Sequence, residues 1–209
     1  GGGHSKAILE NLSKHGRLLA FDQDSAAEQN AIPDERFQLI NGNFSHLKRY
    51  LKFNGVTAVD GILADFGVSS HQFDAGSRGF STRYDGPLDM RMNPLSALSA
   101  REVVNQYIFD DLAQLFKLYG ELRMAKKIAG HIVSKREAAA VETTQELVDL
   151  LKPIFPKNGF NKLIAQVFQA IRIEVNAELD VIKSLLEQSV DVLKQGGRIV
   201  CISYHSLED

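Results

Sequence analysis

Short apolar runs alternate with amphipathic stretches along the first 65 residues of the chain. An apolar run of four to seven residues predicts a strand, and apolar positions three or four residues apart predict a helix. The alternation of the two predicts parallel βαβ units with helices on both faces of a sheet. Strands are expected at 17–22, 37–40 and 59–65, the first and the third of them buried, and helices at 5–12, 25–30 and 45–52.

The middle of the chain has a helical pattern only, with no strand expected between residues 86 and 159. Ser99 and Glu102 have the spacing of a capping box, which marks the start of a helix, and Thr143 and Glu146 repeat it. Helical periods follow at 110–119, 121–135 and 146–151, before Pro153 and Pro156 end the segment.

The α/β pattern returns towards the end of the chain. Residues 163–193 predict a long helix that breaks near Asn176, because asparagine can cap a second helix. The apolar run 198–203 (RIVCIS) predicts another buried strand. We therefore expect a sheet domain in two parts, 1–84 and 161–209, interrupted by a helical insertion at 85–160.

The stretch Asp65–Met92 is a long loop of varied composition that follows a strand. Long loops inside a compact domain are usually functional or disordered, and the Phe, Leu and Met residues of this one argue against disorder. Asp65 stands at the carboxyl end of the preceding strand, where open α/β sheets bind ligands. The loop therefore predicts a binding site.

The composition of the chain excludes some kinds of site and some classes of protein. The 44% hydrophobic and 24% charged residues are ordinary for a globular protein, and the net charge of −2 gives no overall nucleic-acid signature. The single cysteine, Cys201, excludes an intrachain disulfide and a cysteine-based zinc site. No metal site is expected. A cytoplasmic location is the default expectation, without membrane association.

Glycines open the chain, and Gly2, Gly3 and His4 lead directly into a helix. Glycine lets the backbone approach a ligand closely, and a helix N-terminus favours negative charge. A plain turn or a tag remnant fits the same residues. Asp22 ends the next strand, close to the spacing at which an acid binds a ribose hydroxyl. Asp22 could equally be a helix cap or a surface charge, although Asp24 is the better cap. Together these features indicate an adenosine-bearing cofactor.

Three further residues are candidates for that site. Phe44 follows the strand at 37–40, where an aromatic ring can stack on adenine, although an ordinary core phenylalanine fits equally. Asp65 could orient a cofactor ammonium or accept from a substrate amine. Gln72 could bond a cofactor or a base edge.

Basic residues form two groups. Arg78, Arg83 and Arg91 could contact phosphates, or could pair with the aspartates of the same loop. Arg123, Lys127, His131 and Lys135 are four residues apart and share one helical stripe. That stripe could follow a phosphate backbone or could be a solvated helix face, with Ala125, Ile128, Ala129 and Ile132 on the opposite face.

The segment 203–209 (SYHSLED) contains Ser, His and Asp, which invites a hydrolase hypothesis. We reject it because the chain has no G-x-S-x-G elbow, and neighbouring residues on an extended chain point to opposite faces. His205 is more typical of a hydrogen-bonded structural histidine at a strand end.

Motifs along the whole chain resemble the RsmH (MraW) family of S-adenosylmethionine-dependent methyltransferases, which act on N4 of a cytidine in bacterial 16S ribosomal RNA. DGPLDMRM and HSLED are the most specific of these motifs. The full set of motifs that carry the resemblance is GGHS (2–5), DFGVSS (65–70), RGFS (78–81), DGPLDMRM (85–92), AKKIA (125–129), FQAIRIEVNAEL (168–179) and SYHSLED (203–209).

The resemblance implies a Rossmann-like class I methyltransferase sheet with an inserted helical substrate-recognition subdomain. Family members begin with a strand before the Gly loop and continue past HSLED, so this chain looks shortened at both ends, its first strand included. The residues at three positions differ from the family's usual Leu, Phe and Glu: Phe66, Tyr204 and Leu122. The implied contacts to S-adenosylmethionine are Gly2, Gly3, His4, Asp22, Phe44, Asp65 and Gln72.

No catalytic base is assigned, and Ser69 and His205 are only candidates for handling the amine proton. RNA contacts are expected at Arg78, Arg83, Arg91, Arg123, Lys127 and Lys135. The expected partner is 16S ribosomal RNA, within a small ribosomal subunit, and the oligomeric state is open between monomer and homodimer. Two alternatives are a non-catalytic RNA-binding or assembly module and a nicotinamide-dependent dehydrogenase, which explains neither the Asp65 loop nor the helical insertion.

Overall fold

The structure is a computed structural model that describes residues 2–209, with side chains at all of these positions except 70 and 71. The chain divides into two compact units, each with its own hydrophobic core. The first unit is the chain up to Gly67 together with Glu178–Asp209. The second unit is the continuous segment Val68–Ala177. The mixed α/β class predicted from the sequence is confirmed.

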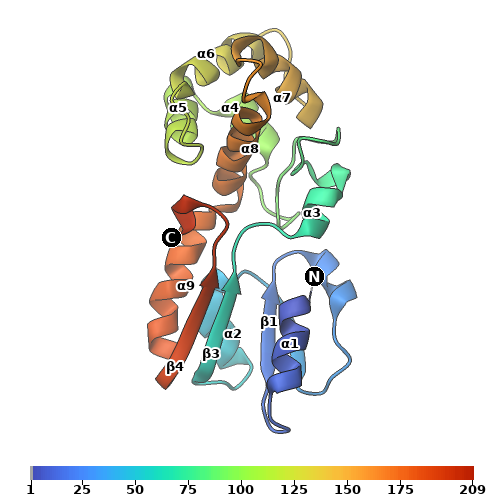
Figure 1. Ribbon diagram of the computed structural model, residues 1–209, viewed down its shortest axis with the longest axis vertical. Helices are drawn as coiled ribbons and strands as arrows, with labels where there is room; N and C mark the ends of the chain where they lie inside the picture. Colours follow the sequence, from blue (N-terminus) through green and yellow to red (C-terminus); the bar gives the residue numbers. More distant parts are fainter. Residues whose placement is uncertain (1) are drawn as a thin grey trace. The chain divides into compact units, whose positions relative to one another are not determined.

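The first unit contains parallel strands. β1 (Leu18–Asp22) pairs with β2 (Phe37–Asn41), so that Asp22 lies opposite Asn41. β3 (Val59–Asp65) pairs with β4 (Leu193–Ile202), with Asp65 opposite Ile202. Within residues 2–209 the strands thus form two parallel pairs (Figure 1).

Helices cover the strands of this unit, with α1 in front of the strands and α2 behind them in Figure 1. Apolar residues of α2 and α9, among them Leu51 and Leu185, pack with Ala64 of β3 and with Phe66 to form its core. The helical elements are α1 (Gly3–Asn11), η1 (Ser25–Asn30), η2 (Phe44–His46), α2 (Leu47–Phe53), α9 (Glu178–Val192) and η5 (Ser206–Glu208).

The strands at 17–22, 59–65 and 198–203 were expected to be buried, but Ala64 is the only buried residue of β1, β3 and β4. Side chains alternate between the two faces of a strand, and the core formed with α2 and α9 covers only one face. Leu63 on β3 and Val200 on β4 keep 40% and 50% of their surface exposed. The apolar runs predict the strands correctly but overestimate their burial.

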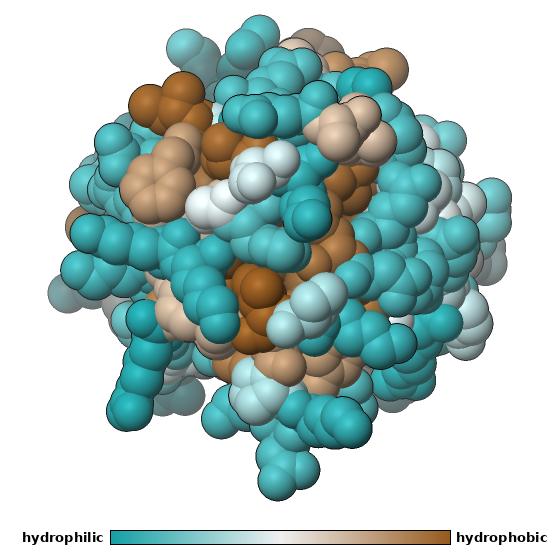
Figure 2. Space-filling model, turned by 90° about the horizontal axis from the view of Figure 1, so that it is seen from above, coloured by the Kyte–Doolittle hydropathy of each residue, from teal (hydrophilic) through white to brown (hydrophobic). Residues whose placement is uncertain are grey.

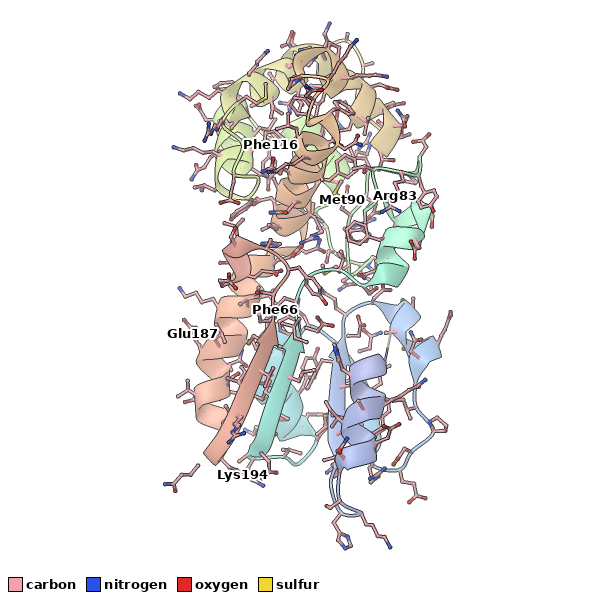
Figure 3. All side chains as sticks on the ribbon, in the orientation of Figure 1. Phe66, Arg83, Met90, Phe116, Glu187 and Lys194 are labelled. Atoms are coloured by element: carbon pink, nitrogen blue, oxygen red, sulfur yellow. The ribbon has the colours of Figure 1, made fainter. Side chains whose placement is uncertain are left out.

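The second unit is helical. Its core includes the fully buried side chains of Met90 and Phe116, which Figure 3 labels. The only bridge between extended residues that it contains, among those described, joins Pro87 to Thr143. Its elements are α3 (Ser70–Asp74), η3 (Gly76–Arg78), α4 (Ala100–Gln106), α5 (Phe109–Leu118), α6 (Ala125–Arg136), α7 (Thr144–Leu151), η4 (Lys152–Ile154) and α8 (Phe160–Asn176).

Both capping boxes are present where the spacing predicts them. The Glu102 carboxylate accepts from the Ser99 backbone N–H at 3.0 Å, before α4. The hydroxyl of Thr143 accepts from the Glu146 N–H at 3.2 Å, before α7. Each box satisfies N–H groups that the first turn of a helix leaves without an intrahelical partner.

Asn176 ends α8 but does not cap a second helix, so that part of the prediction is wrong. Its Nδ2 donates to the Met90 carbonyl at 2.8 Å, and its Oδ1 accepts from the Met92 N–H at 2.7 Å. The break between the helices lies at Ala177, whose φ of 48° is left-handed. Asn176 therefore clamps a loop 84 to 86 positions away in sequence, beside the left-handed φ of 59° at Met90.

The second unit extends further than 85–160, where the sequence places the helical insertion. Phe80 lies before that range and Ile171, on α8, lies after it, yet both belong to the same buried cluster. Burial of apolar surface, rather than the change of periodicity, therefore determines where the compact unit ends.

Candidate functional site

A polar cluster surrounds Asp65 at the carboxyl ends of β3 and β4 in the first unit. The Tyr204 hydroxyl donates to Asp65 Oδ1 at 2.9 Å, and His4 Nδ1 lies 3.3 Å from Asp65 Oδ2. The side chains of His4 and Asp65 are 55% and 40% exposed, so a ligand can reach them. The hydrogen bond to Asp65 and the negative charge of its carboxylate raise the pKa of Tyr204. The cluster thus presents a carboxylate flanked by two hydrogen-bonding groups.

The glycines before α1 take the conformation that the prediction requires. Gly2 has a left-handed φ of 74°, which other residues adopt only with strain, and its carbonyl accepts from the Lys6 N–H at 3.0 Å. Gly3 is the first residue of α1, and His4 follows it. The turn at Gly2 therefore precedes α1 directly, with His4 in the first turn of the helix.

Asp22 ends β1, as predicted, and its Oδ1 accepts from the Asp24 N–H at 2.9 Å. Asp24 in turn accepts from the Ala26 N–H at 3.1 Å, which confirms Asp24 as the cap of η1. The Asp22 carbonyl accepts from the Gly42 N–H at 2.8 Å, directly after β2. These bonds fix Asp22 at the carboxyl end of β1, next to the carboxyl end of β2.

Phe44 begins η2, directly after β2. Its ring packs against Phe66, with centroids 6.4 Å apart, and it is half-buried. The side chain of Asn43 holds the turn by accepting from the Ser45 N–H at 2.8 Å. Phe44 is therefore part of the core while keeping some of its surface accessible.

Gln72 is the one predicted cofactor residue that lies in the second unit, apart from the six in the first. It is buried, and its Oε1 accepts from the Ser69 N–H at 3.0 Å. The Gln72 N–H donates to the Ser69 carbonyl, also at 3.0 Å. With these bonds Gln72 helps to close the first turn of α3.

Two of the loop arginines are engaged within the second unit. Arg78 donates to the carbonyls of Arg91 and Met92 at 2.9 and 3.1 Å, and its guanidinium lies over the ring of Phe80. Arg91 forms a two-point ion pair with Asp89, with bonds of 2.9 and 2.7 Å. Partial burial acts to raise the pKa of Asp89, but the bonds from Arg91 outweigh it and hold that pKa below its ordinary value. Both arginines therefore stabilise the loop itself.

Arg83 has a different environment. It lines a cavity of about 330 Å³ within the second unit. Aromatic rings and a second arginine share the wall of this cavity, which includes Phe73, Phe80, Tyr84, Gln169 and Arg172. Rings that can stack and cations that can meet phosphates are the two features that single-stranded nucleic acids require.

The basic stripe is present on α6, with Lys127 and Lys135 exposed. Arg123 is also exposed but precedes the helix, and His131 is half-buried, with Nε2 2.9 Å from the Leu150 carbonyl oxygen. Hydrophilic residues, teal in Figure 2, dominate the face of the molecule seen there and surround smaller apolar patches. The opposite face of α6 is buried in the core, as predicted, by Ala125, Ile128, Ala129 and Ile132.

The contact between Tyr204 and Asp65 was missed in the sequence. A signal for it existed, because both residues follow apolar runs that form neighbouring parallel strands, and such strands bring their carboxyl ends to the same edge. The pairing of Asp65 with Ile202 places Tyr204 two residues beyond it.

No helix within residues 2–209 is long and apolar enough to cross a membrane.

Comparison with known proteins gives matches over the full chain. It is 57% identical to the ribosomal RNA small subunit methyltransferase H of Flavobacterium johnsoniae, over 100% of this chain and 69% of the relative. The proteins of the same name from Christiangramia forsetii and Bacteroides fragilis are 56% and 49% identical, with the same coverage. The sequence model of the MraW methylase family matches residues 1–209. The chain therefore belongs to the MraW methylase family.

Proposed function

We propose that this chain is an S-adenosylmethionine-dependent methyltransferase that methylates N4 of a cytidine in bacterial 16S ribosomal RNA. The observation that carries the proposal is 57% identity along the whole chain to a relative named ribosomal RNA small subunit methyltransferase H. The substrate is ribosomal RNA within a small subunit, which places the chain in the cytoplasm. The cofactor and the target atom follow from the motifs that resemble the family.

The residues at the strand ends of the first unit fit S-adenosylmethionine. The exposed Asp65 carboxylate suits the cofactor's ammonium, and the left-handed turn at Gly2 and the following Gly3 let the backbone come close. Asp22 offers a carboxylate to ribose hydroxyls, and Phe44 offers an aromatic surface to adenine. When bound, the cofactor supplies an electrophilic methyl group.

Positioning is the main task that remains for the protein, because the lone pair of the cytosine amine is delocalised into the ring. Holding such an amine in line with the methyl group removes much of the barrier. The target base has to leave any stack to reach a pocket. No residue is assigned as the base. Ser69 and His205 remain candidates for accepting the proton, and Gln72 for holding the cofactor or the cytosine edge.

The second unit supplies the RNA surface in this proposal, with residues 85–160 as a substrate-recognition subdomain. Arg83 and the aromatic rings of its cavity suit a splayed nucleotide. The exposed Lys127 and Lys135 on α6 and the neighbouring Arg123 suit the phosphate backbone. Arg78 and Arg91 contribute by shaping the loop, given their internal bonds.

The fold proposal is a Rossmann-like class I sheet. The parallel β1–β2 and β3–β4 pairs support it, as does the position of Asp22 and Asp65 at strand carboxyl ends.

The test is transfer of a radiolabelled methyl group to small ribosomal subunits that lack the modification, with nuclease digestion to identify the labelled nucleoside. We expect label in N4-methylcytidine. RNA binding without transfer would favour the assembly module instead.

A matched pair of variants tests the cofactor site. Asp22→Ala is expected to weaken S-adenosylmethionine binding at least tenfold in calorimetry, whereas Asp60→Ala, at the start of β3 and ion-paired with Lys194, is expected to leave it unchanged. Unchanged binding in Asp22→Ala would remove that residue from the site, and binding of a nicotinamide cofactor instead would favour a dehydrogenase.

A further inference from the structure

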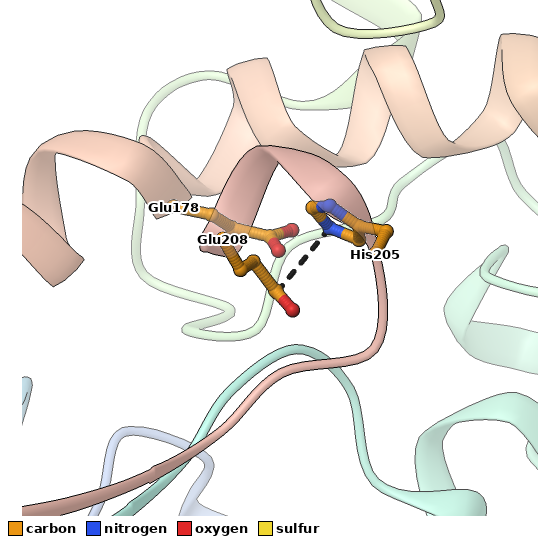
Figure 4. A group of neighbouring side chains, drawn as sticks. All are labelled: Glu178, His205 and Glu208. Atoms are coloured by element: carbon orange, nitrogen blue, oxygen red, sulfur yellow. Dashed lines mark ion pairs between the residues drawn. The ribbon is translucent and has the colours of Figure 1, made fainter.

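We propose that Glu178, His205 and Glu208 form a binding site for a divalent transition-metal ion in the first unit. The three side chains converge in Figure 4, and one potential ligand atom from each lies within 4.8 Å of the other two. This goes beyond the proposed methyl transfer, and it departs from the sequence-based expectation of no metal.

Local structure brings the three residues together. Glu178 is the first residue of α9, directly after the left-handed Ala177. His205 caps η5 and Glu208 ends it. A spacing of three residues in a 3₁₀ turn places side chains on the same side, so His205 and Glu208 face one another, with Nε2 and Oε1 3.2 Å apart.

Burial makes this cluster unlike a solvated acidic patch. Glu178 is 6% exposed, the side chain of Glu208 is 0% exposed, and that of His205 is 13% exposed. Glu208 Oε1 accepts no hydrogen bond from the residues that the structure describes, and its contact is the ion pair with His205. A carboxylate oxygen taken out of water needs a strong partner, which a metal ion provides.

The charge within the cluster also favours a cation. The two carboxylates carry two negative charges, which match the charge of a divalent ion. A divalent ion balances both while leaving His205 neutral, the form in which imidazole ligates metals.

The distances suit a first-row ion. Such an ion binds imidazole nitrogen and carboxylate oxygen at about 2.0–2.2 Å, so two ligand atoms around a tetrahedral ion are about 3.3–3.6 Å apart. Small side-chain movements therefore suffice to close the site. One imidazole with two carboxylates is a set that suits Zn²⁺, whose sites with three protein ligands leave a position for water.

The ion would also organise the edge that carries Asp65. Glu208 Oε2 accepts from the Tyr204 N–H at 2.8 Å, and the Tyr204 hydroxyl donates to Asp65. A metal bound by Glu178 and Glu208 would tie the start of α9 to this segment, and so hold Tyr204 in place.

The test is binding of Zn²⁺ to the whole chain after treatment with a chelator, measured by calorimetry. We expect one strong site, weakened at least tenfold in His205→Ala and in the nearly isosteric Glu208→Gln. His15→Ala, which removes an exposed histidine, is the matched control and should bind as the unsubstituted chain does. Equal affinity in all four proteins would overturn the proposal.

A second measurement needs no variant, in case Glu208→Gln does not fold. Crystals of the unsubstituted chain soaked in Zn²⁺ should show anomalous density between the three side chains. Density only at other histidines would overturn the assignment. Neither measurement depends on methyl transfer, so their failure leaves the proposed function standing.

Discussion

The hydroxyl of Tyr204 donates a 2.9 Å hydrogen bond to Asp65, although the two residues are 139 positions apart in sequence. The parallel register of β3 and β4, with Asp65 opposite Ile202, brings them to one edge. The resemblance to the family leads us to expect Phe at position 204. Relative to that expectation, Tyr204 adds a hydroxyl beside the proposed cofactor site.

This bond predicts a shifted tyrosine titration. Asp65 accepts a hydrogen bond from the phenol hydroxyl, and its negative charge disfavours the phenolate, so the pKa of Tyr204 lies above the ordinary 10.0. The stabilisation from the bond is present below pH 10 and is lost as the pH rises through the raised pKa. Ultraviolet difference titration should show one late-ionising tyrosine fewer in Tyr204→Phe.

The matched variant is Asp65→Asn, which keeps an acceptor but removes the charge. In that variant Tyr204 should ionise closer to pH 10.0. An unchanged titration curve in both variants would mean that the bond is absent in solution.

Arg83 and Arg78 should respond differently to loss of charge. Arg83 lines the cavity, so Arg83→Gln should weaken binding to ribosomal RNA and reduce the slope of log K against log salt by about 1. Arg78 bonds to two loop carbonyls, so Arg78→Gln should lower the free energy of unfolding by about 1–3 kcal/mol.

Filter binding at several salt concentrations measures the effect of Arg83→Gln on RNA binding, and urea unfolding measures the effect of Arg78→Gln on stability. Equal salt slopes for Arg83→Gln and the unsubstituted chain would remove Arg83 from the RNA surface.

Asn176 should contribute strongly to stability. Asn176→Ala leaves the Met90 carbonyl and the Met92 N–H without their bonds to this side chain, which should cost about 2–3 kcal/mol of unfolding free energy in urea denaturation. Asn11→Ala is the control, because Asn11 is exposed and makes one local bond, to the Ala7 carbonyl. A loss no greater than that of the control would contradict the clamp.

The Asp89–Arg91 pair predicts a loss of stability in acid. Because the pKa of Asp89 is below its ordinary value of 3.8, the pair stabilises the fold above that pH and the stabilisation disappears as the pH falls through the lowered pKa. Asp89→Asn should remove about 1 kcal/mol at pH 7, after allowance for solvent screening, and less at a pH well below 3.8. Denaturant unfolding at the two pH values measures the difference, and an equal loss at both would argue against the ion pair as its source.

Local patterns predict local structure well in this chain. The Asp24 cap, the Ser99 and Thr143 capping boxes and the buried face of α6 all depend on successive residues no more than four positions apart, where the geometry of the helix determines the neighbours. The predicted helices and strands were accordingly found, although β4 begins five residues earlier than predicted and α3 was not predicted.

Contacts across long sequence separations could not be predicted in the same way. Asparagine is a residue type that often caps helices, yet the partners of Asn176 are the backbone groups of Met90 and Met92. Only the packing of the second unit brings them together. Arg78 was equally available to phosphates or to the loop, and the fold of the loop decided between them. The proposed roles of the cofactor and RNA residues remain predictions, since they depend on ligands that recognise several segments at once.

The two hydrophobic cores have a consequence for how this protein denatures. The buried residues around Phe116 and those around Leu51 form clusters with no member in common. Two such cores can lose their order at different temperatures, so that a calorimetric scan contains two overlapping transitions and a single melting temperature does not describe the chain. Each stability variant should therefore shift only the transition of its own core, and thermal scans can assign the transitions residue by residue.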